Sequence, residues 1–189
     1  RIQEGIQSLD GFGDIFYHNQ LASGVVPQIT ASIGPSAGGA VYSPAMTDFV
    51  IMVDKLGTMF VTGPDVVKTV LGEEVSFDEL GGAMTHGTKS GVAHFVAKNE
   101  YECMDYIKTL LSYIPQNNTE EPSIVSNDDD PNRLDHNLIN ILPEDSLKPY
   151  DMKEIINSIV DNHNFFEVHE LFAQNIIVGF ARMNGKTIG

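Results

Sequence analysis

The amino-acid sequence predicts an α/β fold, in which short strands and short helices alternate along the chain. Short runs rich in β-branched residues alternate with segments whose apolar residues recur at helical spacing. Glycine stands at nearly every junction between these segments. With 189 residues, 42% of them hydrophobic, the chain can bury the core of one domain, or of one domain and part of another.

The charge and cysteine content narrow the range of functions. Aspartate and glutamate number 26 against 11 lysines and arginines, which argues against a general nucleic-acid binder because such proteins need a basic face. The single cysteine, Cys103, argues against a disulfide framework and indicates a reducing compartment. The sequence shows no apolar run of membrane-spanning length and no signal-peptide pattern, so we expect no membrane association.

The first part of the chain begins with a helical pattern and continues with strands. Residues 1–23 are amphipathic, and we expect the glycines within residues 10–13 to interrupt their helix. Residues 36–46 are rich in small side chains and predict a tight turn that leads into a short helix. Three strands are expected in this part, at residues 25–33, 49–53 and 58–62.

Pro64 begins the next predicted helix, because proline is favoured at the first helical position and apolar residues at helical spacing follow it. From Pro115 the composition changes, and residues 116–132 lack periodicity and are typical of a polar linker. The remaining expected elements are a short helix at 73–80, a strand at 90–96, a helix at 101–114, a short ordered piece at 138–142, a helix at 151–160, a strand at 176–183 and a hairpin turn at Asn184–Gly185.

The segment from Ile33 to Val41 is the most informative part of the sequence, since a strand runs through successive small residues into a helix. Its glycines let a ligand approach the main chain closely, and the first amides of the new helix have no partner within it. Such a turn can hold an anion or the oxygen of a polarised carbonyl. A glycine-rich packing turn without any ligand is the alternative, and the residues alone leave both open.

The same segment matches the Gly-x-Ser-x-Gly pattern of serine hydrolases, with Ser36 in the place of the nucleophile. Asp54 and His86 would complete a triad, with His94 as a substitute base. A small residue selected for space is the competing explanation, because glycine is abundant here and no separate oxyanion motif accompanies the pattern. No metal site is expected: Asp128 and Asp130 imitate a calcium loop that lacks its required glycine, and the histidines show no ligand spacing.

Seven motifs occur in order along the chain: Arg1–Gly5, Gly24–Ile29, Gly38–Ala45, Thr62–Lys68, Glu79–Ala83, Ser90–His94 and Ile176–Arg182. Together they resemble the carboxyltransferase (beta) subunits of biotin-dependent acyl-CoA carboxylases, most closely the propionyl-CoA carboxylases. The likeness covers almost the whole chain and is far more specific than any single motif. Many relatives carry cysteine where this chain has Ser36, which exchanges one small side chain for another.

The resemblance implies a crotonase/ClpP-like fold, a superhelix of ββα units that the complete subunit contains twice. Residues 1–115 would form the later part of the N-terminal crotonase-like carboxyltransferase domain. Residues 116–150 would be the polar linker, and residues 151–189 the start of the C-terminal crotonase-like domain. A complete member of the family is more than twice as long, so the chain is expected to be a fragment that is inactive by itself.

The resemblance also implies the reaction, in which a carboxyl group moves from carboxybiotin to the α-carbon of propionyl-CoA or acetyl-CoA. Removing the α-proton places negative charge on the thioester oxygen, which main-chain amides can stabilise. By similarity, the residues that form this oxyanion hole are Gly38, Gly39 and Ala40. Further contacts with the substrate would come from Gly34, Ser36, Ala37, Tyr42, Gly63 and Pro64.

The implied cofactor is biotin, carried on a biotinylated alpha subunit or a biotin carrier protein, with an acyl-CoA as substrate and no metal. The full-length protein would assemble with copies of itself, as a hexamer, and would bind neither nucleic acid nor membrane. It would lie in the cytoplasm of a bacterium or in the mitochondrial matrix of a eukaryote. Two alternatives remain: a serine hydrolase that uses Ser36, and a non-catalytic fragment that only folds and assembles.

Overall fold

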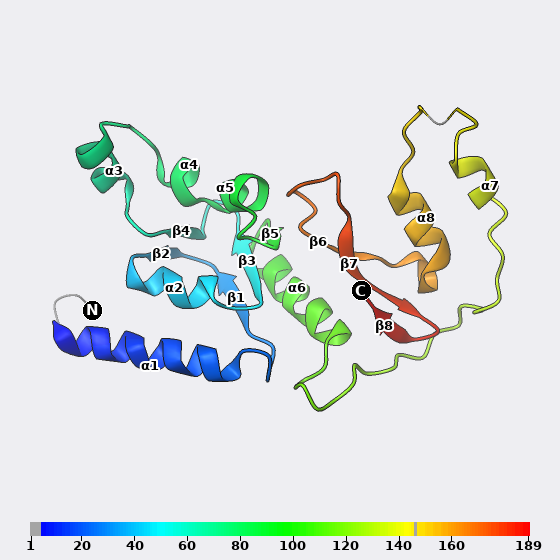
Figure 1. Cartoon of the computed structure of the whole chain (residues 1–189), viewed down its shortest axis with the longest axis horizontal. Helices are drawn as coiled ribbons and strands as arrows, with labels where there is room; N and C mark the ends of the chain where they lie inside the picture. Colours follow the sequence, from blue (N-terminus) through cyan, green and yellow to red (C-terminus); the bar gives the residue numbers. More distant parts are fainter. Residues whose placement is uncertain (1–4, 146) are drawn as a thin grey trace.

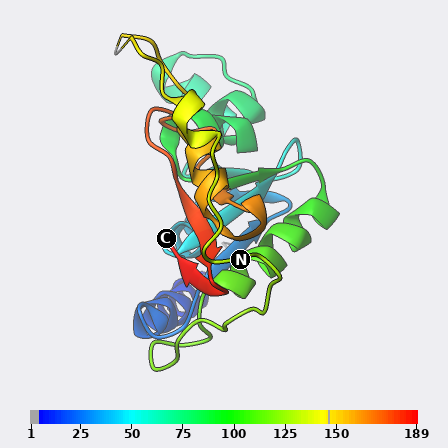
Figure 2. The same ribbon diagram turned by 90° about the vertical axis from the view of Figure 1, so that its right-hand side faces the viewer.

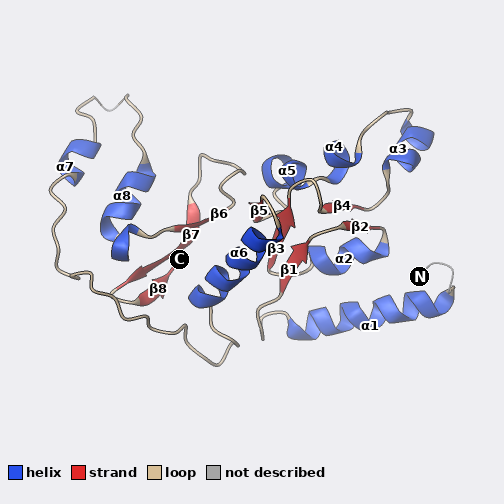
Figure 3. Ribbon diagram, turned by 180° about the vertical axis from the view of Figure 1, so that it is seen from behind, coloured by secondary structure: helices blue, strands red, loops and turns tan. Residues whose placement is uncertain are grey.

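The computed structural model describes residues 5–145 and 147–189, so most of the Arg1–Gly5 motif and the start of the first helical pattern lie outside the described residues. Figure 1 shows an N-terminal body of helices and short strands, a C-terminal sheet, and the helix α6 (Glu100–Tyr113) between them. Figure 3 shows the same arrangement from behind. The α/β class predicted from the sequence is confirmed.

The remaining elements of the N-terminal body are α1 (Ile6–Ala22), β1 (Ile29–Ser32), β2 (Pro35–Ala37), α2 (Gly39–Ala45), β3 (Phe49–Val53), β4 (Thr58–Phe60), α3 (Pro64–Leu71), α4 (Phe77–Gly81), α5 (Ala83–Thr85), the π-helical turn η2 (His86–Ser90) and β5 (Phe95–Ala97). Those that follow are α7 (Leu138–Ile141), α8 (Met152–Ile159), the 3-10 turn η3 (Asp161–His163), β6 (Phe166–Val168), β7 (Val178–Met183) and β8 (Lys186–Ile188).

Parallel pairing organises the N-terminal body. The strands β1, β3 and β5 form one sheet with β3 at its centre, where Ile51 pairs with Ala31 on one side and with Phe95 on the other. Because both faces of this central strand are covered, the side chains from Val50 to Val53 are all buried. The strands β2 and β4 form a second parallel pair, and β6, β7 and β8 form an antiparallel sheet.

Aromatic rings join the C-terminal sheet to the N-terminal body. The Phe166 ring of β6 lies 5.0 Å from the Phe95 ring of β5 and 5.7 Å from the Tyr113 ring of α6, and it is stacked on both. Phe180 of β7 stacks on Tyr113 at 5.9 Å and meets Phe49 of β3 at 6.2 Å. The two regions therefore share one hydrophobic core, although more than fifty residues separate them in the sequence.

Several predicted elements are confirmed with nearly the expected bounds. The strand β3 covers residues 49–53, and α3 begins at Pro64. The helix α6 begins after Asn99, whose side chain accepts a hydrogen bond from the Glu102 amide at 3.0 Å. Asn184 and Gly185 both have positive φ angles, 51° and 76°, as a two-residue hairpin turn of the primed type requires.

Other expectations about secondary structure are wrong. The helix α1 continues without interruption through residues 10–13, because the ring of Phe12 packs against α2 and this contact outweighs the low helix propensity of two glycines. The strand expected from residue 25 begins only at Ile29, since the amides of Val25 and Val26 turn back to the Ala22 carbonyl.

Three further differences concern α4, β5 and β6. The strand expected at residues 90–96 is limited to residues 95–97, because Gly91 adopts a left-handed conformation with φ 71° after the π-helical turn. The short helix expected at 73–80 begins only at Phe77, after a capping box in which Ser76 and Glu79 exchange hydrogen bonds. The strand β6 was not expected at all, since three residues are too few to show a period.

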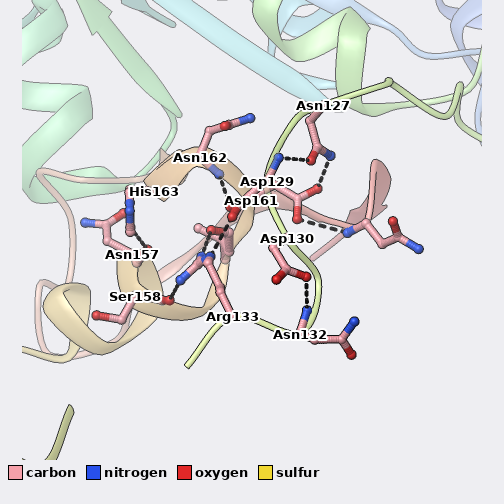
Figure 4. A network of polar contacts seen from close by, with 12 residues as sticks. Asn127, Asp129, Asp130, Asn132, Arg133, Asn157, Ser158, Asp161, Asn162 and His163 are labelled. Atoms are coloured by element: carbon pink, nitrogen blue, oxygen red, sulfur yellow. Dashed lines mark hydrogen bonds and ion pairs between the residues drawn. The ribbon is translucent and has the colours of Figure 1, made fainter. Parts of the chain in front are cut away.

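The polar linker is an extended segment that runs along the outside of the C-terminal sheet from α6 to α7 (Figure 2). Figure 4 shows how Arg133 attaches it to the end of α8. The Arg133 guanidinium donates hydrogen bonds to Asp129 at 2.7 Å and to the Val160 carbonyl at 2.7 Å, and it also reaches the Ser158 carbonyl. A cation at this position satisfies the free carbonyls at the end of the helix.

Asp161 forms a second attachment beside Arg133. Its carboxylate accepts hydrogen bonds from the side-chain amide of Asn127 at 2.8 Å and from the main-chain amides of Asn184 at 2.9 Å and Gly185 at 2.7 Å. The linker, the end of α8 and the β7–β8 hairpin are therefore held together by one hydrogen-bonded network.

Candidate functional site

The turn between β2 and α2 has the geometry of an amide pocket. Gly38 adopts φ 61° and ψ −134°, a conformation that favours glycine, and its own amide donates to the carbonyls of Phe60 and Val61. The amides of Gly39 and Ala40, by contrast, have no acceptor within the described part of the chain. Of the three residues that the resemblance assigned to an oxyanion hole, Gly38 therefore shapes the turn and the other two present donors.

An aromatic wall from α1 stands beside this turn, and α1 and α2 run side by side in Figures 1 and 3. A Cβ atom built on Gly39 would lie 3.3 Å from the nearest ring carbon of Phe12. Phe12 stacks on Phe16, with ring centroids 6.0 Å apart, and the Phe16 ring meets the edge of Tyr42 at 6.2 Å. The wall consequently closes one side of the turn with apolar surface.

The pairing of β2 with β4 brings most of the other sequence-predicted site residues to the same place. Both strands are parallel, so Gly38 at the end of β2 lies beside the segment that leads from β4 to Gly63 and Pro64. Ala37 and Tyr42 flank the turn within the same segment of chain and are exposed. Gly34 stands at the opposite end of β2, where its carbonyl accepts a hydrogen bond from the Thr58 amide at 3.3 Å.

The geometry contradicts a catalytic triad around Ser36. The Ser36 hydroxyl donates to the Ala40 carbonyl at 3.0 Å, and no described histidine bonds to it. Both ring nitrogens of His86 are engaged elsewhere, with the Ser90 hydroxyl at 2.7 Å and the Met59 carbonyl at 2.6 Å. The proposed substitute, His94, accepts a hydrogen bond from a main-chain amide of β3. The serine hydrolase alternative is therefore wrong.

A cavity of about 520 Å³ lies away from the turn, between β5, α6 and the C-terminal region. Tyr106, Phe166, His94 and His169 line it, together with several carboxylates. Burial, followed by the neighbouring His169, lowers the pKa of His94 to about 4, and burial also lowers the pKa of His169. Sequence reasoning missed this cavity because its walls come from segments far apart in the chain.

Two further observations bear on the function classes. Within residues 5–145 and 147–189, no three histidine, cysteine, aspartate or glutamate side chains converge as metal ligands would. None of the helices in these ranges combines the length and the apolar character needed to cross a bilayer.

The parallel strands and the glycine turn that opens α2 define an α/β protein with unpartnered main-chain amides at that turn. Comparison with known proteins identifies its family. The carboxyl transferase domain family matches residues 1–189, and the chain belongs to this family. In the crystal structure of transcarboxylase 12S with hydrolysed methylmalonyl-coenzyme A bound, one chain superposes with a TM-score of 0.96 at 50% identity. That match covers 100% of this chain and 37% of the other. The predicted crotonase-like carboxyltransferase fold is thereby confirmed.

Similar sequences carry related descriptions. The chain is 58% identical to the propionyl-CoA carboxylase carboxyltransferase subunit of Haloferax mediterranei, over all of this chain and 37% of that protein. It is 52% identical to the methylmalonyl-CoA decarboxylase subunit alpha of Veillonella parvula, with the same coverage. It is 51% identical to the mitochondrial propionyl-CoA carboxylase beta chain of Homo sapiens, of which it covers 35%. The family resemblance of the motifs is confirmed, and the chain spans little more than a third of the length of these relatives.

Proposed function

We propose that the full-length protein transfers a carboxyl group from carboxybiotin to the α-carbon of an acyl-CoA, with propionyl-CoA as the preferred substrate and acetyl-CoA next. The observation that carries this proposal is the pair of amides at Gly39 and Ala40, which have no acceptor in the described part of the chain. They fit a thioester oxygen, which becomes negatively charged when the α-carbon loses its proton. Membership of the carboxyl transferase domain family supports the same reaction.

The chain contributes binding and charge stabilisation to this reaction. Two amides aimed at the thioester oxygen are stronger donors to an enolate than to a neutral carbonyl, so they lower the barrier to removal of the proton. Gly38 lets the thioester approach the main chain, and the aromatic wall from α1 limits the access of water on one side of the turn. Biotin, held by a partner protein, supplies the carboxyl group when it is bound.

The proposal assigns the neighbouring residues of the turn to acyl-CoA binding. Ala37 and Tyr42 are exposed beside the two donors and can contact the substrate directly. The substrate-binding set comprises Gly34, Ser36, Ala37, Tyr42, Gly63 and Pro64. Ser36 acts there as a small side chain whose hydroxyl is already bonded to a carbonyl, not as a nucleophile.

The proposal extends to the organisation of the full-length protein. Residues 1–115 belong to the N-terminal crotonase-like domain, residues 116–150 are the linker, and residues 151–189 begin the C-terminal crotonase-like domain. The partners are a biotinylated alpha subunit or carrier protein and five further copies in a hexamer, in the bacterial cytoplasm or the mitochondrial matrix. The hexamer assembly described for transcarboxylase 12S supports this arrangement. The 189-residue chain alone is expected to be inactive.

Two substitutions in the full-length protein, assayed with its biotinylated partner and propionyl-CoA, test the proposal. Ser36→Ala should retain most of the carboxyl transfer. Gly39→Val should lower kcat by about 100-fold or more, because a branched side chain would overlap the Phe12 ring and displace the donors. Gly13→Val is the matched control, since the space around Gly13 is open. Loss of transfer with Ser36→Ala, or full transfer with Gly39→Val, would contradict the proposed site.

A further inference from the structure

We propose that Phe12 is a positioning residue, whose ring fixes the direction in which the amides of Gly39 and Ala40 point. This inference rests on the proposed function, because it concerns the same turn. Three atoms of the Phe12 ring would lie 3.3–3.6 Å from a Cβ atom built on Gly39. The ring therefore packs on Gly39 at the position where another residue would carry its side chain. The contact leaves Phe12 partly buried, on a helix in which no residue is fully buried.

The turn needs such support because its own helix holds it weakly. The helix α2 has seven residues, contains Pro44, and begins at Gly38 without a side-chain hydrogen bond to cap it. Short helices derive most of their stability from tertiary packing rather than from their own hydrogen bonds. The contact of Phe12 with Gly39 supplies such packing at the first turn of α2, where the two donors are located.

The position of Phe12 is in turn fixed by contacts farther along α1. Asn19 accepts a hydrogen bond from the Ser43 hydroxyl at 2.7 Å and donates one to the Gln28 side chain at 2.7 Å. Between Asn19 and Phe12, the ring of Phe16 stacks on Phe12. These hydrogen bonds therefore hold the C-terminal part of α1 against Ser43 of α2 and against Gln28. The stacking of Phe16 on Phe12 then holds the Phe12 ring in place beside Gly39.

Phe12 and Gly39 should consequently behave as a coupled pair. A methyl group on Gly39 would approach the ring more closely than Cβ contacts normally allow, so the ring or the turn must shift by a few tenths of an ångström. Once the ring is removed, the same methyl group has room. The effect of Gly39→Ala on catalysis should therefore depend on whether Phe12 is present, and a double-mutant cycle measures this dependence.

The test uses the full-length protein with its biotinylated partner and propionyl-CoA. Phe12→Ala should lower kcat by about tenfold or more while KM changes little, because the donors act on the charge that develops in the transition state. Phe12→Tyr keeps the ring and should restore kcat. Tyr17→Ala, an exposed aromatic position on the same helix, is the matched control and should leave kcat unchanged. Gly39→Ala should cost several-fold less in the Phe12→Ala protein than in the wild type.

The possible failures are distinguishable. If the wild-type protein transfers no carboxyl group, the proposed function is wrong and the inference falls with it. If the wild type is active but Phe12→Ala behaves like Tyr17→Ala, or changes only KM, the positioning role is refuted. Additive effects of Phe12→Ala and Gly39→Ala would refute it as well. If Phe12→Ala does not fold, Phe12→Leu replaces it in the double-mutant cycle with Gly39→Ala. A folded Phe12→Leu protein with normal kcat also counts against the proposal.

Discussion

Protonation of His94 should destabilise the folded chain as the pH falls. The main-chain amide of Val50 donates to its Nδ1 atom at 3.1 Å, which requires that nitrogen to be unprotonated, and the His169 ring lies 4.4 Å away. Burial and this second histidine together lower the pKa of His94 to about 4 in the folded state. Its ordinary pKa of 6.5 applies to the unfolded chain.

The sign and size of the effect follow from these two pKa values. Between pH 6.5 and pH 4 the unfolded chain binds a proton at His94 that the folded chain does not, so the free energy of unfolding falls as the pH is lowered. About 1.4 kcal/mol for each pH unit amounts to about 2 kcal/mol between pH 6.5 and 5. The ring is only partly buried, and solvent screening reduces this contribution to about 1 kcal/mol.

Urea unfolding at pH 7.5, 6.5 and 5 measures the effect. The wild-type chain should lose about 1 kcal/mol more than His94→Gln between pH 6.5 and 5, because glutamine does not titrate. His136→Gln is the matched control, since that side chain is exposed, and it should follow the wild type. Equal pH dependence in the wild type and His94→Gln, or an NMR titration of His94 with a midpoint near 6.5, would refute this reasoning.

Two further expectations concern packing and the linker. Gly81→Ala would place a methyl group against the carbonyl oxygen of Met59 and should lower the free energy of unfolding by about 1–3 kcal/mol. Gly11→Ala adds a methyl group where no neighbouring atom lies close, and it should raise the free energy of unfolding by up to about 1 kcal/mol because alanine favours the helix. Urea unfolding measures both effects. Arg133→Lys keeps the charge but loses the forked donor, so limited proteolysis should cut the linker faster than in the wild type. Equal cleavage rates would show that the arginine does not hold the linker.

The sequence predicted correctly those elements whose position depends only on residues within or next to them. The strand β3 is a continuous apolar run, and the start of α3 at Pro64 and the hairpin turn at Asn184–Gly185 depend on the backbone preferences of those residues. The turn at Gly38 was also predicted, because its glycines and the following helix are adjacent in the sequence.

Features that depend on distant contacts could not be predicted in this way. The glycines of α1 indicated an interruption, but packing of Phe12 on α2 keeps the helix continuous. In the sequence, Arg133 stands where the calcium loop that begins at Asp128 would need its glycine, and nothing nearby indicates its partners. In the structure it binds the carbonyls at the end of α8, more than twenty residues later. The cavity beside His94 likewise forms only when residues near 95, 106 and 166 come together.

A crystal structure of the full-length protein with an unreactive propionyl-CoA analogue bound tests the central claim most directly. The thioester oxygen should lie 2.7–3.1 Å from the amide nitrogens of Gly39 and Ala40, as is usual for donors that stabilise an oxyanion. An oxygen bound elsewhere, or amides at these two residues that point away from the acyl group, would contradict the account.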